Sequence, residues 1–273
     1  MQSGAIRPIP NMLPRKLFTS EHEAFRETVR KFYEKEVVPN IEKYEKQQHV
    51  DRDLWNKAGE LGLLCTTMPE QYGGSGVDRL YSMILIEEQA YAMDSSTGFS
   101  LHSDIVANYI NNFGNEEQKQ KWLPKMATGE TVTAIAMTEP GTGSDLQAVR
   151  TTAALDGDEY VINGSKIFIT NGYLCDMAIV VCKTGNNEKG SANLSLIIVE
   201  ADRAGFSKGK PLNKIGMKGQ DTCELFFDNV RVPKENLLGM EGMGFIMLMK
   251  ELAWERMLVA IICQAGAEAA FAH

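Results

Sequence analysis

The sequence lacks the residue patterns of a metal centre and of a Ser-His-Asp hydrolase. No two cysteines form a CxxC pair, no histidine lies near a cysteine at metal-ligand spacing, and the histidines are scattered singly. We therefore expect buried thiols, no metal site and no catalytic triad. The cysteines are Cys65, Cys175, Cys182, Cys223 and Cys263, and the histidines are His22, His49, His102 and His273.

Long hydrophobic runs and an excess of positive charge are also missing. No apolar run is long enough to cross a bilayer, and residues 1–16 contain no signal-peptide core, so we expect no transmembrane segment. The expected location is the cytoplasm if the source is bacterial and the mitochondrial matrix if it is eukaryotic. The net charge of −8 argues against a nucleic-acid partner, because phosphate binding needs clustered Lys and Arg.

The N-terminal part of the chain has the apolar period of helices. Ser20 and Glu23 form a predicted capping box, and the apolar residues that follow recur every three or four positions. A second N-cap is predicted at Asn115, and Pro39 predicts a kink or restart between two helices. Residues 1–128 are therefore expected to form a helical domain.

The period changes near Gly129. Short segments with alternating apolar residues, separated by turns rich in Gly, Asn and Asp, continue to about Pro233 and predict an antiparallel barrel or sandwich over residues 129–239. Residues 240–273 return to a helical pattern that is mostly apolar and stops without a cap. The expected class is α+β, with a helical domain, a β-barrel-like domain and the start of a second helical domain.

The stretch TAIAMTEPGTGSD, at residues 133–145, is the first candidate site. A strand that ends in a glycine-paired turn lets backbone N–H groups and hydroxyls approach a bound molecule closely. The same residues also suit an ordinary strand end with a Pro-Gly turn, and the residues alone leave both interpretations open.

Two glutamates in the last helix form the second candidate. Glu251 and Glu255 lie one turn apart in an otherwise apolar pattern. A buried carboxylate is costly without a partner, and desolvation raises its pKa toward the range of a general base. The alternative is a surface pair formed by Glu255 and Arg256.

Four separated stretches resemble acyl-CoA dehydrogenases: GNEEQKQKWLPKMATGE, AMTEPGTGSDL, VINGSKIFITNG, and MKGQDTCELFFDNVRVP leading to KELAWER. Within that family the sequence is most similar to the long-chain type, followed by the isovaleryl type. The resemblance implies a helical N-terminal domain, a middle β-domain and a C-terminal four-helix bundle. It also implies bound FAD between the β-domain and the bundle.

The resemblance also implies site residues. Phe168 would pack on the flavin ring, whereas its alternation alone predicts a residue of the β-domain core. Glu255 would remove the pro-R α-proton as the β-hydride passes to flavin, and Arg256 would contact substrate. The implied cofactor-binding residues are Ile135, Met137, Thr138, Gly143, Ser144, Phe168, Ile169 and Thr170. The implied substrate-binding residues are Ser144, Trp254, Glu255 and Arg256.

The implied activity is α,β-dehydrogenation of acyl-CoA thioesters in fatty acid β-oxidation. The implied partners are the acyl-CoA substrate and electron-transferring flavoprotein, and the implied assembly is a homotetramer. Ile246 stands where the long-chain type has a substrate-contacting tyrosine. Complete family members continue well beyond the position that corresponds to His273, which leaves the hypothesis of a truncated, non-catalytic remnant or binding module. Acyl-CoA oxidases share the flavin site and differ in whether oxygen reaches the reduced ring, so an acyl-CoA oxidase is a third hypothesis.

Overall fold

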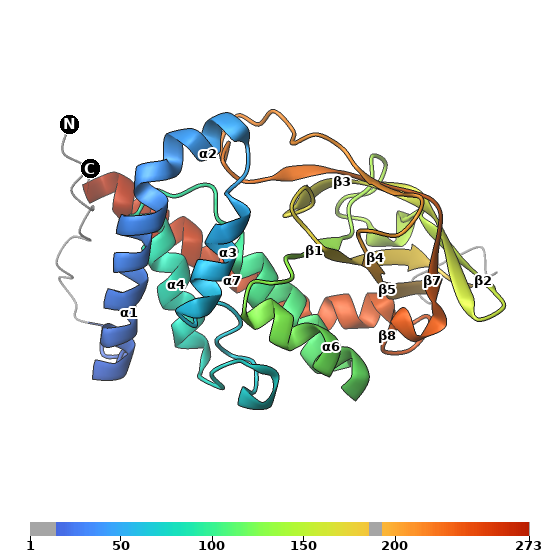
Figure 1. Ribbon diagram of the computed structural model, residues 1–273, viewed down its shortest axis with the longest axis horizontal. Coiled ribbons are helices and arrows are strands. Elements are labelled where there is room, and N and C mark those ends of the chain that lie inside the picture. The colour runs from blue at the N-terminus through green and yellow to red at the C-terminus, as the bar shows by residue number, and fades with distance from the viewer. Residues whose placement is uncertain (1–14, 186–192, 273) are drawn as a thin grey trace.

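A computed structural model describes residues 15–185 and 193–272. Residues 1–14, which bear on the expectation of no signal peptide, lie outside the described residues. Helices occupy one end of the molecule and a twisted sheet the other (Figure 1). The long helix α7 (Gly244–Ala272) runs from the sheet past the helices. The α+β class and the order of the three parts are confirmed.

The helical part begins one residue earlier than its predicted cap. Thr19 is the N-cap of α1, and the capping box is closed by His22 rather than by Glu23. The Nδ1 atom of His22 accepts the Thr19 N–H at 3.1 Å, which is the contact that a glutamate oxygen makes in the usual box. The helical segments are α1 (Ser20–Phe32), the π-helix η1 (Tyr33–Val37), the 3-10 helix η2 (Val38–Asn40), α2 (Ile41–Gln47), α3 (Arg52–Glu60), the 3-10 helix η3 (Glu70–Tyr72), α4 (Arg79–Tyr91), the π-helix η4 (Leu101–Val106), α5 (Ala107–Phe113) and α6 (Glu116–Ala127).

Two predicted features of these helices are confirmed. The chain changes from α1 to α2 through a π-helix and a 3-10 helix that contains Pro39, because proline cannot donate the hydrogen bond that a continuous helix needs. Asn115 caps α6, and Gln118 closes a capping box with it.

Within residues 15–185 and 193–272, the β-domain contains eight strands in one sheet of order β6-β7-β3-β2-β4-β5-β8, and β1 pairs with β4 outside this path. The pairs β1–β4 and β2–β4 are parallel, so the sheet is mixed and not purely antiparallel as expected. Among the described residues no pairing of β6 with β8 closes the sheet into a barrel. Its elements are β1 (Thr133–Ala136), the 3-10 helix η5 (Leu146–Ala148), β2 (Thr152–Asp156), β3 (Glu159–Thr170), β4 (Met177–Lys183), β5 (Leu194–Glu200), β6 (Phe206–Lys208), β7 (Thr222–Pro233), the 3-10 helix η7 (Lys234–Asn236) and β8 (Leu237–Leu238).

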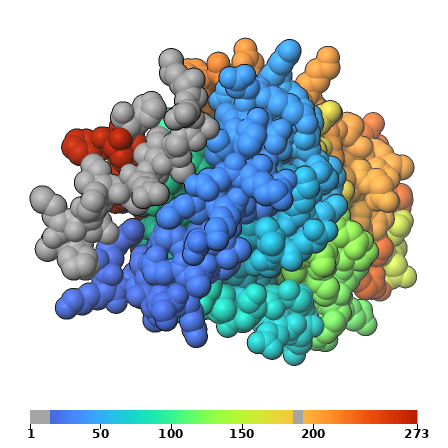
Figure 2. Space-filling view, turned by 60° about the vertical axis from the view of Figure 1, so that its left-hand side comes forward, coloured from blue at the N-terminus to red at the C-terminus, as the bar shows by residue number. Residues whose placement is uncertain are grey.

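Two of the contacts between the helical part and the sheet show how the two parts are joined. The loop between β6 and β7 lies on α2, where Gln48 Nε2 donates to the Leu212 carbonyl at 3.1 Å (Figure 2). The second contact is His102, which is fully buried between α6 and β1. Its Nε2 donates to the Met126 carbonyl at 3.0 Å, and its Nδ1 accepts the Thr133 N–H at 3.2 Å. The parts therefore share a buried polar junction.

Helix α7 contacts both parts. At its first residue, Gly244, an added Cβ would lie 2.7 Å from the Leu194 carbonyl oxygen, so glycine is needed for the approach to β5. Near its other end, the Tyr91 hydroxyl donates to Glu268 at 2.7 Å. No helix within residues 15–185 and 193–272 is both long and apolar enough to span a membrane. The same residues contain no cluster suited to a metal ion.

Candidate functional site

The turn that follows β1 is closed by its own backbone. The Glu139 N–H donates to the Thr142 carbonyl at 2.9 Å, and the Thr142 N–H donates back to the Glu139 carbonyl at 3.0 Å. Gly143 and Ser144 follow this turn and are exposed. The hydroxyl of Thr142 is buried and has no hydrogen-bond partner among the described residues. Because buried polar atoms are usually paired, this hydroxyl marks a place where a bound molecule could supply the partner.

Phe168 lies at an irregularity in β3. The register with β7 shifts between Lys166 and Ile169, and Phe168 has a φ angle of 61°, which is uncommon for any residue with a side chain. Its side chain is 63% exposed, whereas the neighbouring Ile169 is buried. The expectation from alternation, that Phe168 belongs to the core, is therefore wrong, because the bulge turns the ring outward. An exposed aromatic ring on strained backbone is typical of a binding surface.

The turn and the bulge lie side by side. The Ile167 N–H donates to the Thr138 carbonyl at 2.9 Å, so the residue before Phe168 is joined to the residue before Glu139. Lys166 is fully buried beneath them, and its Nζ donates to the Met137 carbonyl at 3.1 Å and to Glu139 Oε1 at 2.9 Å. The turn and the bulge are thus joined by a backbone hydrogen bond and by the buried side chain of Lys166.

Glu139 anchors this network from the other side. Its carboxylate accepts the Arg150 N–H at 2.6 Å, the Thr151 N–H at 2.9 Å and the Thr151 hydroxyl at 2.6 Å. Burial alone would raise the pKa of Glu139, but the hydrogen bonds from Thr151 and the charge of Lys166 outweigh burial and lower it. Glu139 therefore stays ionised and fixes the turn to the start of β2.

Both glutamates of α7 face the helical part of the molecule. The Tyr109 hydroxyl donates to Glu255 Oε1 at 2.8 Å, and Asn112 Nδ2 donates to Glu251 Oε1 at 2.9 Å. Glu251 is buried and Glu255 is partly buried. Burial raises the pKa of Glu255, the hydrogen bond from Tyr109 lowers it, and the charge of Glu251 raises it, with a net rise. A partly buried carboxyl with a raised pKa has the properties that a general base requires.

The neighbours of Glu255 differ from each other in exposure. Trp254 is partly buried, and the guanidinium of Arg79 lies over its ring at 4.3 Å from the centroid. Arg256 is exposed. The alternative, a surface pair formed by Glu255 and Arg256, therefore does not fit. Arg256 is at the surface, but the carboxylate of Glu255 points to Tyr109.

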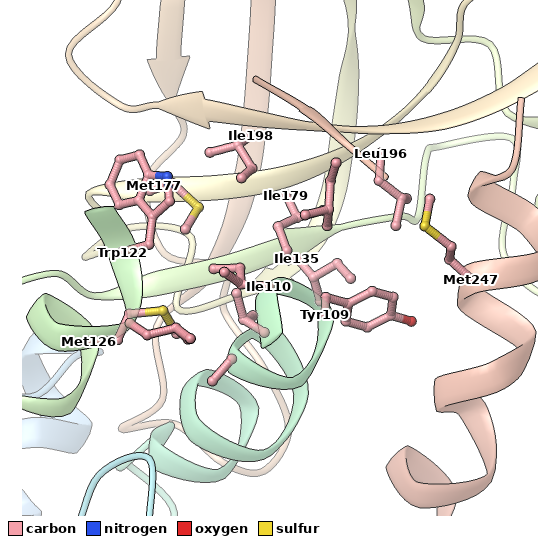
Figure 3. Packing of buried hydrophobic residues seen from close by; sticks show 14 of the residues in the cluster. Tyr109, Ile110, Trp122, Met126, Ile135, Met177, Ile179, Leu196, Ile198 and Met247 are labelled. Atoms are coloured by element: carbon pink, nitrogen blue, oxygen red, sulfur yellow. The ribbon is translucent and has the colours of Figure 1, made fainter. Parts of the chain in front are cut away.

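One hydrophobic cluster connects β1 with the partner of Glu255. Ile135, Tyr109 and Met247 belong to the same buried cluster, and Met137 packs against it. Figure 3 shows the Tyr109 ring between its own helix and α7, with its hydroxyl directed toward the helix that carries Met247. Ile135 on β1 and Met137, which follows this strand, therefore pack in or against the same cluster as Tyr109, the hydrogen-bond partner of Glu255.

The sequence analysis does not identify several residues that hold the site. Lys166 has a signal that could have identified it, because it is a charged residue at an inward-facing position of an alternating strand. Glu139 gave no such signal, since it lies in a turn. Tyr109 and Asn112 lie about 140 positions before their partners, and no spacing rule connects them.

Comparison with known proteins follows the same division of the chain. Residues 19–130 match the family model "Acyl-CoA dehydrogenase, N-terminal domain", and residues 134–230 match "Acyl-CoA dehydrogenase, middle domain".

Curated relatives extend the likeness beyond these two domains. The long-chain specific acyl-CoA dehydrogenase of Sus scrofa is 48% identical over 99% of this chain, and the alignment covers 63% of that relative. The isovaleryl-CoA dehydrogenase of Solanum tuberosum is 39% identical over 89% of this chain and 60% of its own length. The chain thus spans less than two thirds of the length of these relatives.

Solved structures share the fold. An acyl-CoA dehydrogenase from Geobacillus kaustophilus has a TM-score of 0.91 and 49% identity, and the match covers 94% of this chain and 68% of that chain. An acyl-CoA dehydrogenase complexed with FAD, from Bacillus anthracis, has a TM-score of 0.85 and 38% identity over 93% of this chain and 44% of that chain.

Proposed function

This chain belongs to the acyl-CoA dehydrogenase family, and from that premise we propose that it oxidises fatty acyl-CoA thioesters to trans-2-enoyl-CoA. The observation that carries the proposal is the partly buried Glu255, whose pKa is raised and whose carboxylate is held by Tyr109. A thioester α-proton is weakly acidic, so its removal needs a base with little access to water. We assign that role to Glu255.

The family is FAD-dependent, and the β-domain offers features that suit a flavin. The exposed ring of Phe168 provides a flat apolar surface, and the unpartnered hydroxyl of Thr142 marks a position for a hydrogen bond. FAD, when bound, supplies a ring that accepts a hydride. The proposed cofactor residues are Ile135, Met137, Thr138, Gly143, Ser144, Phe168, Ile169 and Thr170.

The residues of this chain would act on substrate from two sides. The turn with Ser144 and the residues Trp254 and Arg256 are proposed to bind the acyl-CoA, and Glu255 receives the α-proton on the oxygen that Tyr109 leaves free. The surrounding apolar residues exclude water, which keeps the pKa of the carboxyl raised. The proton and the hydride then leave adjacent carbons, and a double bond forms between them.

The likeness to the long-chain relatives supports a long acyl chain as substrate. Ile246, which is 46% exposed in this structure, occupies the position of a substrate-contacting tyrosine in those enzymes, so it is a candidate for altering the chain-length preference. The proposal has three further parts. Electron-transferring flavoprotein accepts the electrons, the complete protein is a homotetramer, and its location is the mitochondrial matrix or the bacterial cytoplasm.

The test is the single substitution Glu255→Gln in the FAD-loaded protein, followed by stopped-flow absorbance of the flavin after acyl-CoA is added. We expect reduction to slow by at least about a thousandfold, since glutamine cannot accept the proton. Glu268→Gln, at the far end of the same helix, should reduce flavin at the wild-type rate. Near-normal reduction in the Glu255→Gln protein would refute the assignment of the base. Loss of reduction in Glu251→Gln alone would move it to Glu251.

A further inference from the structure

Tyr109 makes a contact with the proposed base that no sequence motif indicates. Its ring is fully buried on α5, and its hydroxyl lies 2.8 Å from Glu255 Oε1. Tyr109 lies shortly after the π-helix η4, which ends at Val106. A π-helix inserts an extra residue and turns the side chains that follow it, and such insertions are frequent at functional sites. The local geometry therefore directs this hydroxyl at α7.

A second hydrogen bond runs parallel to the first. Asn112 lies three residues after Tyr109 on α5, and its partner Glu251 lies four residues before Glu255 on α7. Side chains three or four positions apart share one face of a helix, so the two bonds join facing sides of helices that run in opposite directions. Together they set the rotation of α7 about its axis. One bond alone would leave that rotation less restricted.

We propose that Tyr109 is a positioning residue for Glu255, which fixes one carboxylate oxygen and leaves the other to accept the substrate proton. The proposal rests on the function assigned above. Among the described residues Glu255 Oε1 has the Tyr109 hydroxyl as its partner, and Oε2 has none. A carboxylate with one bound and one free oxygen has a fixed orientation and still keeps a lone pair for proton transfer.

The bond also affects the pKa of the base. A hydrogen bond to the charged form of a carboxyl lowers its pKa, and a nearby negative charge raises it. Tyr109 supplies the first effect and Glu251 the second, and burial is larger than either. Two titratable groups on other elements lie on this side of α7. Arg79 of α4 stacks on Trp254, the residue before Glu255. Asp104 of η4, whose pKa burial raises to about 7, accepts a hydrogen bond from Ser82 at 2.5 Å and feels the charge of Arg79.

These contacts predict opposite shifts for two substitutions. Tyr109→Phe removes the donor, so the pKa of Glu255 should rise by about one unit or more, given the usual strength of a hydrogen bond to a charged group. Glu251→Gln removes the negative charge, so the pKa of Glu255 should fall. A purely structural role for Tyr109 predicts neither sign, because loss of packing lowers the rate at every pH.

The measurement has two readouts. Infrared difference titration, with Glu255→Gln subtracted, follows the protonated carboxyl band directly and needs no cofactor. The pH dependence of flavin reduction by acyl-CoA in the FAD-loaded protein reports the same group during turnover. In Tyr109→Phe both midpoints should move to higher pH, and in Glu251→Gln both should move to lower pH.

A matched control exists on the same helix. Tyr91 donates to Glu268 at 2.7 Å, so Tyr91→Phe removes an equivalent hydroxyl from a pair that lies far from Glu255. That variant should titrate as the wild type does. If Tyr109→Phe does not fold, 3-fluorotyrosine at position 109 keeps the shape of the ring and strengthens the donor, and should lower the midpoint.

The outcomes separate this inference from the proposed function. If Glu255→Gln still reduces flavin, the base has been assigned wrongly and the function proposed above fails. If Glu255→Gln is inactive but the midpoint of Tyr109→Phe, or of the 3-fluorotyrosine protein, coincides with that of the wild type, Tyr109 does not position the base and the inference is overturned.

Discussion

The two sides of the candidate site are held by different kinds of contact. On the β-domain side, Lys166 and Glu139 join the turn, the bulge and the start of β2 through at least five hydrogen bonds, several of them to backbone groups. On the α7 side, two single side-chain bonds, from Tyr109 and Asn112, orient the two glutamates. The first side is fixed redundantly and the second by one bond for each carboxylate.

The difference shows where each side is vulnerable. A network with many bonds to backbone keeps its shape if one bond is lost, but it contains buried charges that are costly when unpaired. A single side-chain bond on α7 orients one carboxylate and helps to set the rotation of the helix, so its loss acts mainly on that carboxylate. Substitutions on the β-domain side should therefore act mainly on stability, and substitutions on the α7 side mainly on chemistry.

The largest effect is expected from Lys166→Met. Glu139 would stay buried without its ammonium partner, and breaking a buried pair in this way typically costs about 3–5 kcal/mol in the free energy of unfolding. Urea denaturation followed by circular dichroism would measure the loss. The control is Lys125→Met, which breaks an exposed pair with Glu130 and should cost less than about 1 kcal/mol. Equal losses in the two variants would contradict the comparison.

The junction between the two parts predicts a pH effect of intermediate size. Burial lowers the pKa of His102 to about 4, from an ordinary value of 6.5. Because the folded state disfavours the charged ring, the stability that the neutral ring contributes is complete above pH 6.5 and is lost as the pH falls toward 4. The wild-type protein should lose on the order of 3 kcal/mol across this window relative to His102→Gln.

The check on His102 is a series of denaturation curves between about pH 4 and about pH 7.5, which brackets the window over which the ring titrates. Thr133→Val keeps the imidazole and removes the hydroxyl that lies 2.8 Å from its Nδ1, so it should still lose stability as the pH falls, over a narrower window than the wild type because the neutral ring loses one donor. Parallel curves for the wild type and His102→Gln would show that the ring does not titrate as described.

The smallest effect is expected from Phe168→Asn, which should raise the stability of the protein and weaken its binding of FAD. Asparagine tolerates a positive φ angle better than phenylalanine, so Phe168→Asn should stabilise the protein by up to about 1 kcal/mol. The same change removes the exposed ring, so FAD, measured by fluorescence titration, should bind more weakly. Unchanged FAD affinity would argue that the strained ring serves no cofactor. Phe226→Asn, at another exposed phenylalanine, should not weaken FAD binding.

The sequence predicted elements better than contacts. The change of period near Gly129, the cap at Asn115 and the interruption at Pro39 follow from local chemistry, and all three are present. Phe168 was ambiguous, because alternation predicts a core residue and one inserted residue in β3 reverses the face on which the ring lies. Glu251 and Glu255 were recognised as unusual, but their spacing could not show which face of α7 meets α5.

What the sequence determined by itself is the class of each segment and the family, because helical and strand periods and short turn motifs depend on residues that are close in the chain. Only the tertiary structure decided that Lys166 pairs with Glu139 and that Tyr109 reaches Glu255. Those contacts join residues 27 and 146 positions apart, and their formation depends on how the chain packs around them. A carboxylate becomes a candidate base only when that packing removes it from water and gives it a donor.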